Sequence, residues 1–308
     1  MGKKIVVFGS YITDFVMRTT AFPVPGQSVI GSSFKMGPGG KGSNQTIAAL
    51  KLGADAIFVT KIANDTFGEY AQTFYKAEGY DTSGFIIGNT SYTGAANIVV
   101  NEQSGENAIV VTPGISMEYT PEDMAHVKAF IDDADYLVLQ LEVSEYATSE
   151  AITYAKQKGI TIILNPAPAA GFVKPLLAGI DYLTPNETEA SLLTGLPVED
   201  KSNIRAAAKA LREMGVAHVI ITLGGNGIYA FDGKNEQFIP ALDVVAVDTT
   251  GAGDAFNGGF AAALAAGKGF FDAALYGVAV SGLSVTKEGT SLSMPTKQEA
   301  DQVYKTLK

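Results

Sequence analysis

The chain has no cysteine among its 308 residues, which excludes disulfides, thiolate metal sites and cysteine nucleophiles. It has only two histidines, His126 and His218. A histidine-based zinc site and a Ser-His-Asp triad therefore lack the necessary residues. We expect both histidines to be structural.

Basic residues are also scarce, since 22 lysines and arginines face 32 acidic residues and give a net charge of -10. An extended nucleic-acid surface needs basic side chains to neutralise phosphates, so we expect no nucleic-acid partner. A local phosphate pocket is still compatible with this charge. No apolar run approaches membrane-spanning length, and the short run at residues 5–8 indicates a buried strand rather than a signal peptide. We expect a cytoplasmic protein without a membrane partner.

Short β-rich runs alternate with helical patterns along most of the chain. This alternation predicts right-handed βαβ units and a parallel sheet covered on both faces. Neither repeats nor linkers divide the chain, so we expect one domain over residues 1–308. The expected strands are 5–8, 57–62, 136–140, 160–164, 182–184 and 219–223, and the expected helices 43–52, 70–78, 145–158, 204–214, 255–266 and 296–308.

Two segments depart from this alternation, at about residues 12–36 and 93–111. Both contain extended patterns and turn residues, with no helix between them. One interpretation is a small β layer that projects from the main sheet. The other is a pair of ordinary hairpins, and the sequence favours neither.

Residues 248–256 read D-T-T-G-A-G-D-A-F, between an apolar run at 244–247 and an Ala-rich helical pattern that begins just after Gly253. Gly251, Ala252 and Gly253 leave their backbone N–H groups accessible, and the dipole of the following helix favours an anion there. The sequence therefore predicts a phosphate site.

Asp254 places a carboxylate beside this anion site. A negative charge there would repel phosphate, which suggests a task such as accepting a proton from an attacking hydroxyl. The alternative is that Asp254 merely caps the helix. This stretch alone does not decide between the two.

Residues 37–44 read G-P-G-G-K-G-S-N and fit two phosphate motifs superficially. A P-loop requires Ser or Thr after its Lys and a Gly five positions before Gly40, but the chain has Gly42 and Lys35. A dinucleotide fingerprint would join the first strand to the first helix, which this stretch does not. What remains is a glycine-rich turn with Ser43 as an expected N-cap and a polar ligand close to Lys41 and Asn44.

These stretches together resemble the ribokinase-like (PfkB) family of sugar and nucleoside kinases. The resemblance covers nearly the whole chain and implies a three-layer α/β/α sandwich with a mainly parallel sheet and a small β-sheet lid. It also implies that Asp254 is the catalytic base and that Gly251, Ala252 and Gly253 form the anion hole. The matching sugar-binding positions are Asp14, Ile12, Gly40, Lys41, Gly42, Ser43, Asn44, Glu142 and Asp254.

The resemblance further implies ATP, Mg²⁺ and K⁺ as cofactors. Asn186 and Glu189 match an N-x-x-E motif of the phosphate and magnesium region, although Glu189 could simply cap a helix. The implied nucleotide positions are Asn186, Glu189, Thr222, Leu223, Gly224, Gly225, Asn226, Gly227 and Gly253. The implied K⁺ positions are Asp248, Thr250, Ser284, Lys287, Gly289 and Ser293.

The resemblance is closest to ribokinases and deoxyribokinases and implies transfer of the ATP γ-phosphate to the 5-hydroxyl of D-ribose or 2-deoxy-D-ribose. Ile12 departs from ribokinases, which have Asn there, and agrees with deoxyribokinases. The lid implies a homodimer. Other sugar or nucleoside kinases of the family, a non-catalytic sugar-binding module and a dinucleotide-dependent oxidoreductase are the alternatives.

Overall fold

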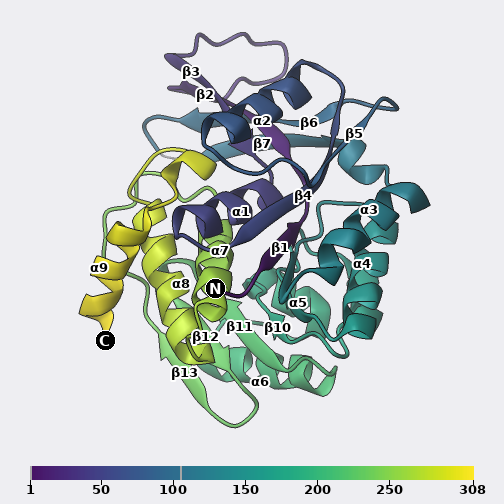
Figure 1. Ribbon diagram of the computed structural model, residues 1–308. Coiled ribbons are helices and arrows are strands. Elements are labelled where there is room, and N and C mark those ends of the chain that lie inside the picture. Colours follow the sequence, from purple (N-terminus) through teal and green to yellow (C-terminus); the bar gives the residue numbers. More distant parts are fainter. Residues whose placement is uncertain (1, 105) are drawn as a thin grey trace.

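A large sheet forms the centre of the computed structural model, which describes residues 2–104 and 106–308 (Figure 1). Its strands are β1 (Ile5–Phe8), β4 (Ala56–Ala63), β5 (Phe85–Gly88), β8 (Tyr136–Leu139), β9 (Thr161–Leu164), β10 (Tyr182–Leu183), β11 (His218–Thr222), β12 (Ile228–Phe231) and β13 (Glu236–Ile239). The order across the sheet is β13-β12-β11-β10-β9-β8-β1-β4-β5. Pairing is parallel from β11 to β5 and antiparallel for β12 and β13.

Helices cover both faces of this sheet. One side carries α1 (Lys41–Lys51), α2 (Thr66–Ala77), α7 (Ala252–Ala265), α8 (Phe270–Ser284) and α9 (Lys297–Leu307). The other carries α3 (Pro121–Asp132), α4 (Glu145–Lys158), α5 (Glu187–Thr194) and α6 (Lys201–Glu213). Short 3-10 turns are η1 (Ile115–Met117), η2 (Gly171–Leu176), η3 (Gly224–Asn226) and η4 (Ser291–Ser293). The predicted three-layer sandwich is confirmed.

Strand β1 shows why the strand sequences are continuously apolar. Val6 and Phe8 pack among the residues of α3 to α6, whereas Ile5 and Val7 pack among those of α1, α7 and α8. Successive side chains of a strand point to opposite faces, so a strand buried on both faces must be apolar at every position. All four residues of β1 are buried.

Several elements differ from the sequence-based expectation. Helix α8 escaped prediction because it is almost wholly apolar and largely buried, which leaves no amphipathic period to detect. The β12–β13 hairpin was also missed. The apolar run at residues 244–247 is not a strand: Val245 is 86% exposed, and the N–H groups of Val247 and Asp248 donate to the Val285 carbonyl at the end of α8.

A second, smaller sheet lies at one end of the main sheet, at the top of Figure 1. It consists of β2 (Ile12–Thr19), β3 (Ser33–Gly39), β6 (Thr93–Asn101) and β7 (Asn107–Gly114), in the order β3-β2-β6-β7. Strands β2 and β6 are parallel, and the other two pairs are antiparallel. The predicted small β layer is therefore confirmed, with β3 and β7 running three residues past the expected bounds of 36 and 111.

Helices α1 and α7 approach closely beneath this small sheet. A Cβ atom on Gly258 of α7 would lie 2.5 Å from the Ala48 Cβ atom and 2.6 Å from the Gln45 carbonyl oxygen of α1. Only glycine permits this approach. As a result, the first turns of the two helices face each other at the edge of the main sheet. No helix in the described part of the chain is long and apolar enough to cross a bilayer.

Candidate functional site

Two adjoining cavities lie beyond the carboxyl ends of β9, β10 and β11, where ligands of open α/β sheets commonly bind. The smaller has a volume of about 170 Å³ and is lined by Lys41, Glu189 and Asp254, among others. The larger has a volume of about 550 Å³. The two share Thr222, Thr249, Ala252 and Gly253 as lining residues. A ligand that occupies both would therefore pass over the first turn of α7.

Helix α7 begins at Ala252, three residues earlier than expected, with Gly251 as its N-cap at a φ of 78°. The Ala252 N–H donates to the Thr249 carbonyl oxygen at 3.2 Å, so it is not free for a ligand as predicted. The N–H groups of Gly253 and Asp254 belong to the first helical turn, where a helix provides no acceptor of its own. A Cβ atom on Gly253 would meet nothing within 4 Å. The anion-binding geometry is therefore centred on Gly253.

Asp254 lies in this first turn with its carboxylate 5% exposed. Its Oδ2 accepts a hydrogen bond from the Asn44 Nδ2 at 2.9 Å, and its Oδ1 accepts one from the Gln45 Nε2 at 3.0 Å. Burial raises the pKa of Asp254, while the charge of Lys41 and the two amide donors oppose that rise. The carboxylate makes no side-chain cap hydrogen bond to the helix, in contrast to the capping alternative.

Lys41 provides a positive charge near Asp254 and the other carboxylates of the site. Its Nζ lies 3.8 Å from the Glu142 Oε1, and the Glu142 Oε2 accepts hydrogen bonds from the Lys41 N–H at 2.9 Å and the Ser10 Oγ at 2.6 Å. Burial alone would lower the pKa of Lys41, but the carboxylates of Asp254, Glu142, Glu189 and Asp14 raise it above its usual value. Lys41 is therefore held in its charged form.

Asp14 lies on β2 of the small sheet, opposite the glycine-rich turn. Its Oδ2 accepts a hydrogen bond from the Thr290 Oγ1 at 3.0 Å, and a Cβ atom on Gly39 would lie 2.2 Å from the carboxylate. Burial, more than the nearby Glu142 and Asp254 charges, raises the pKa of Asp14 to about 7. At neutral pH this carboxyl group can thus both donate and accept hydrogen bonds.

The glycine-rich turn differs from expectation at its cap. Helix α1 begins at Lys41 with Gly40 as N-cap at a φ of 85°, so Ser43 is not the cap. Ser43 is fully buried and accepts a hydrogen bond from the Tyr75 hydroxyl at 3.0 Å, which indicates a packing role. Gly42 is equally constrained, because a Cβ atom there would lie 2.7 Å from the Gly9 carbonyl carbon.

Ile12 lies at the start of β2 and is 2% exposed. It packs with Ala96 and Ile98 of β6. It shares a face of β2 with Asp14, because residues two apart on a strand point the same way. Its Cγ1 atom would lie 3.1 Å from a Cβ atom on Gly40. Ile12 therefore borders the turn and the Asp14 side of the site.

Asn186 and Glu189 form the capping box of α5. The Asn186 Oδ1 accepts from the Glu189 N–H at 2.8 Å, and the Glu189 Oε2 accepts from the Asn186 N–H at 2.9 Å. Burial raises the pKa of Glu189, and Asn186 and Lys41 oppose the rise. Both residues also line the 170 Å³ cavity, so the capping role and exposure to a ligand coexist.

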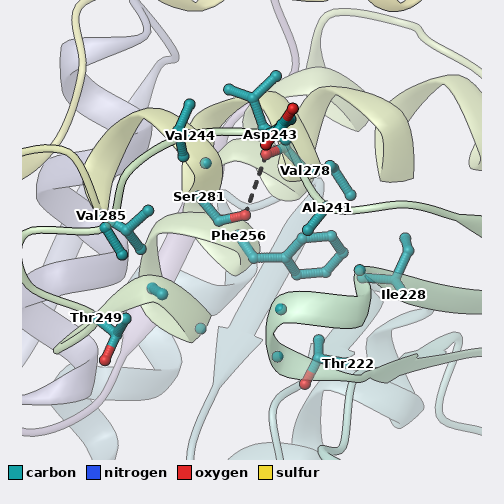
Figure 2. Close-up of a pocket in the computed structure, with 18 residues that line it drawn as sticks. Thr222, Ile228, Ala241, Asp243, Val244, Thr249, Phe256, Val278, Ser281 and Val285 are labelled. Carbon is teal, nitrogen blue, oxygen red and sulfur yellow. Dashed lines mark hydrogen bonds between the residues drawn. The ribbon is translucent and has the colours of Figure 1, made fainter.

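The 550 Å³ cavity has mostly small and apolar walls (Figure 2). Figure 2 shows Phe256 between Ser281 on one side and Thr222 and Ile228 on the other. Of the expected nucleotide turn, Thr222, Gly224, Gly225 and Gly227 line the cavity, but Leu223 and Asn226 do not. Leu223 is buried in the core on the α5 and α6 side of the sheet, whereas Asn226 is exposed.

Two of the expected cation positions, Thr250 and Gly289, contact the Asp248 carboxylate. Its Oδ1 accepts from the Thr250 N–H at 2.9 Å and its Oδ2 from the Gly289 N–H at 3.0 Å. Lys287 directs its ammonium to Glu299 at 2.8 Å, and its N–H donates to the Ser284 carbonyl oxygen at 3.1 Å. Ser293 is tied to the same loop, because its Oγ donates to the Thr290 carbonyl oxygen at 2.7 Å. Within the described residues, no group of three or more histidine or acidic side chains could hold a metal ion.

Comparison with known proteins agrees with this geometry. Residues 2–297 match the model of the pfkB family carbohydrate kinases. The chain belongs to this family. A ribokinase of Haemophilus influenzae is 38% identical over 299 residues, covering 97% of each chain. A deoxyribokinase of Salmonella typhi is 35% identical over 299 residues, again covering 97% of each.

The structure also resembles solved pfkB family kinases. The structure of Arabidopsis thaliana ribokinase complexed with ribose and ATP has a TM-score of 0.89, at 28% identity and 99% coverage of both chains. Because the chain belongs to a carbohydrate kinase family, it is not a dinucleotide-dependent oxidoreductase. The chain is thus an ATP-dependent sugar kinase by family.

Sequence reasoning missed several polar residues of this pfkB kinase site. Ser10, Gln45, Thr290 and Ser291 contact the predicted site residues directly through hydrogen bonds. Gln45 directly follows the glycine-rich motif at residues 37–44, so its place in the sequence could have indicated a site residue. Thr290 and Ser291 carried none, since their contacts depend on how the segment after α8 folds back over the site.

Asp14→Asn should alter the pH dependence of stability. The folded pKa of Asp14, about 7, exceeds its ordinary value of 3.8, so its contribution to stability is complete below about pH 4 and is lost as the pH rises to 7. In urea unfolding, the free energy of unfolding of the wild type should fall with rising pH by up to about 1.4 kcal/mol per pH unit from this group. Asp14→Asn should not show this decrease.

Asp232→Asn is the matched control. Backbone donation from Asn235 lowers the pKa of this carboxyl to about 2, so its contribution is lost only as the pH falls below about 4. If the free energy of unfolding changed equally with pH in the wild type and in Asp14→Asn between pH 5 and 7, Asp14 would be ionised throughout that range. This result would contradict the prediction.

Proposed function

We propose that this pfkB kinase transfers the γ-phosphate of ATP to the 5-hydroxyl of D-ribose, 2-deoxy-D-ribose or both. The observation that carries the proposal is the position of Asp254, which is buried and lines the 170 Å³ cavity with Lys41, next to Gly253, which lines both cavities. The names of the relatives, ribokinase and deoxyribokinase, support a pentose as the acceptor. The chain acts as one kinase domain in the cytoplasm, where ATP is available.

In the proposed reaction, the 5-hydroxyl oxygen bonds to the γ-phosphorus as the bond to the β–γ bridging oxygen breaks, and ADP leaves. Asp254 accepts the hydroxyl proton. The Gly253 and Asp254 N–H groups and the Lys41 ammonium stabilise negative charge on the moving phosphoryl group. Such transfer depends mainly on positioning and electrostatics.

ATP would place its base and ribose in the 550 Å³ cavity and its phosphates over the first turn of α7, which both cavities share. Mg²⁺ prefers oxygen ligands, keeps several waters and bridges phosphates when bound. Glu189 and Asn186 suit an outer shell that contacts such waters, because both line the 170 Å³ cavity and their oxygens, held in place by the capping hydrogen bonds, each keep a second lone pair.

Asp254→Asn should keep the fold and lose most turnover. The change preserves side-chain shape but removes the proton acceptor, and general-base steps contribute roughly 10²- to 10⁴-fold. A coupled ADP-release assay with D-ribose, 2-deoxy-D-ribose and adenosine measures the effect and tests the acceptor class. Near-normal turnover in this variant would exclude Asp254 as the base, and a wild type that binds pentose without releasing ADP would indicate a sugar-binding module.

The sugar specificity of this site is proposed to involve Ile12. A buried hydroxyl without a partner costs about 1 to 3 kcal/mol, and an apolar side chain cannot satisfy one. Since Ile12 borders the turn beside Asp14, a sugar lacking the 2-hydroxyl would avoid this penalty. We propose that 2-deoxy-D-ribose is accepted well, with a slight preference over D-ribose.

Ile12→Asn should raise kcat/KM for D-ribose relative to 2-deoxy-D-ribose, because the amide supplies the missing partner. Ile98→Val, in the same small apolar cluster, controls for altered packing and should leave the ratio unchanged. An unaltered ratio in Ile12→Asn would mean that Ile12 only fills the interior of the small sheet.

A monovalent cation, K⁺, is proposed to bind the loops joined by Asp248. The matching positions, Asp248, Thr250, Ser284, Lys287, Gly289 and Ser293, offer mainly backbone oxygens, which suit a weakly charged ion. Gly251 lies next to these loops, since its Cβ position is 3.5 Å from the Thr290 Cα. An ion there would order the N-cap of α7.

The initial rate should therefore be higher in K⁺ than in Na⁺ or a bulky organic cation at constant ionic strength. Equal rates in the three salts would contradict a monovalent-cation site. Asp248→Asn should weaken the K⁺ dependence without changing KM for the sugar, because it loses the charge that holds the two loops.

The small sheet is proposed to act as a lid and to pair two subunits. It exposes Met17, Phe34, Met36 and Val110 on one face and Ile109 and Val111 on the other, so the first face carries four large apolar side chains. Thin sheets rarely leave such a face in water.

Light scattering at micromolar concentration should report a mass of about twice the 32.2 kDa chain. Phe34→Asp, with an exposed charge on that sheet, should shift the population toward the monomer. A monomeric wild type would contradict pairing through the small sheet.

A further inference from the structure

Each oxygen of the Asp254 carboxylate is held by a different side-chain amide. Asn44 donates to Oδ2 at 2.9 Å and Gln45 donates to Oδ1 at 3.0 Å. A carboxylate only accepts hydrogen bonds, so each amide must turn its nitrogen, and not its oxygen, toward Asp254. The orientation of two amides thus determines how the carboxylate lies.

Each amide is also hydrogen-bonded at its other end. The Ser291 Oγ donates to the Asn44 Oδ1 at 2.6 Å. On the other side, the Gln140 Nε2 donates to the Gln45 Oε1 at 2.7 Å. Flipping Gln45 would break its bonds to both Gln140 and Asp254, whereas flipping Asn44 would break only the bond to Asp254, because a hydroxyl can accept as well as donate. Gln45 is therefore held with its nitrogen toward Asp254, and Ser291 holds the Asn44 side chain in place while the Asp254 carboxylate selects its nitrogen.

The second hydrogen of the Gln45 amide is also used. It donates to the Asn165 Oδ1 at 3.2 Å, and the Asn165 Nδ2 donates in turn to the Thr184 carbonyl oxygen at 3.1 Å. Gln45 consequently has no donor left for a sugar. Its exposed fraction is 0%, as is that of Gln140.

Gly9 leaves the room that the Gln140 side chain of this network occupies. A Cβ atom on Gly9 would lie 2.0 Å from the Gln140 Oε1. Burying Asn44, Gln45 and Gln140 is costly unless they are hydrogen-bonded, and the Gln140 Oε1 itself has no hydrogen-bond partner among the described residues. Packing alone would be served more cheaply by apolar residues, so the network indicates a role beyond stability.

We propose that Gln45 and Ser291 are positioning residues that hold the Asp254 carboxylate in the orientation and charge state needed to accept the sugar proton. This inference rests on the proposed role of Asp254 as the base. Gln45 acts on Oδ1 directly, and Ser291 acts on Oδ2 through Asn44. Both residues are almost completely buried, at 0% and 1% exposed, so each acts through Asp254 and not on the sugar or ATP itself.

Two variants remove these contacts separately. Gln45→Met keeps the approximate shape but deletes the donor to Oδ1, and Ser291→Ala removes one hydroxyl and frees Asn44 to rotate. Loss of a hydrogen bond to a charged group shifts the acid limb of the kcat–pH profile upward by about one pH unit. We expect that shift in both variants, with kcat lowered about 10-fold at pH values on the acid side of the limb and KM for ATP unchanged.

Other charged side chains also lie close to Asp254. Lys41 of α1 favours the ionised carboxylate, whereas Glu142, Glu189 and Asp14 oppose it. Neither substitution alters any of these groups. A shift in the acid limb therefore reports the lost donors.

Ser116→Ala is the matched control, because Ser116 is also fully buried but lies in η1, against β4 and β6. Its profile should overlay that of the wild type. If Gln45→Met fails to fold, Ser291→Ala still tests the proposal alone. Lower kcat with an unmoved acid limb in the folded variants would overturn the proposal and leave a packing role.

The same measurements separate this inference from the proposed function. A wild type that phosphorylates no pentose would refute the proposed function. A second outcome would refute only the positioning role. In that outcome the wild type is active and Asp254→Asn loses turnover, but Gln45→Met and Ser291→Ala have the same acid limb as the wild type.

Discussion

A carboxylate buried at the start of a helix is the constraint on which this structure depends. Desolvation opposes the ionised form of Asp254, and the fold offsets that cost with the Lys41 charge and two amide donors from α1. The donors reach Asp254 only because α1 and α7 approach closely at Gly258. The close packing of α1 against α7 at Gly258 thereby determines which donors reach the Asp254 carboxylate.

The acidic side chains of the site have different hydrogen-bond partners. Asp14 has a pKa of about 7 and contacts Thr290, so it suits hydrogen bonding to a neutral sugar. Glu142 lies against Lys41 and two hydrogen-bond donors. In the proposed reaction only Asp254 must be charged, because a base has to accept a proton whereas a carboxyl group that binds a sugar hydroxyl does not.

Much of the fold follows from short-range patterns in the sequence. Strand β1 and helix α6 are predictable because one is continuously apolar and the other strongly amphipathic. Helix α8 is not, because its apolar residues surround it. The cap of α1 was misassigned to Ser43, since a glycine with positive φ replaced a side-chain cap. The glycine motifs predict the two helix N-termini that meet at the candidate site, but the contact between Thr290 and Asp14 spans 276 residues and has no local signature.

The most direct test of the account is the position of the transferred phosphate. Phosphorus-31 NMR of the wild-type protein with ATP, Mg²⁺, K⁺ and either D-ribose or 2-deoxy-D-ribose follows the γ-phosphate as it leaves ATP. We predict a single new monoester whose phosphorus couples to the two C5 protons, with ADP formed in equal amount. Formation of inorganic phosphate alone, or of an ester at C1, would contradict the arrangement of Asp254 and the α7 N-terminus proposed for 5-hydroxyl transfer.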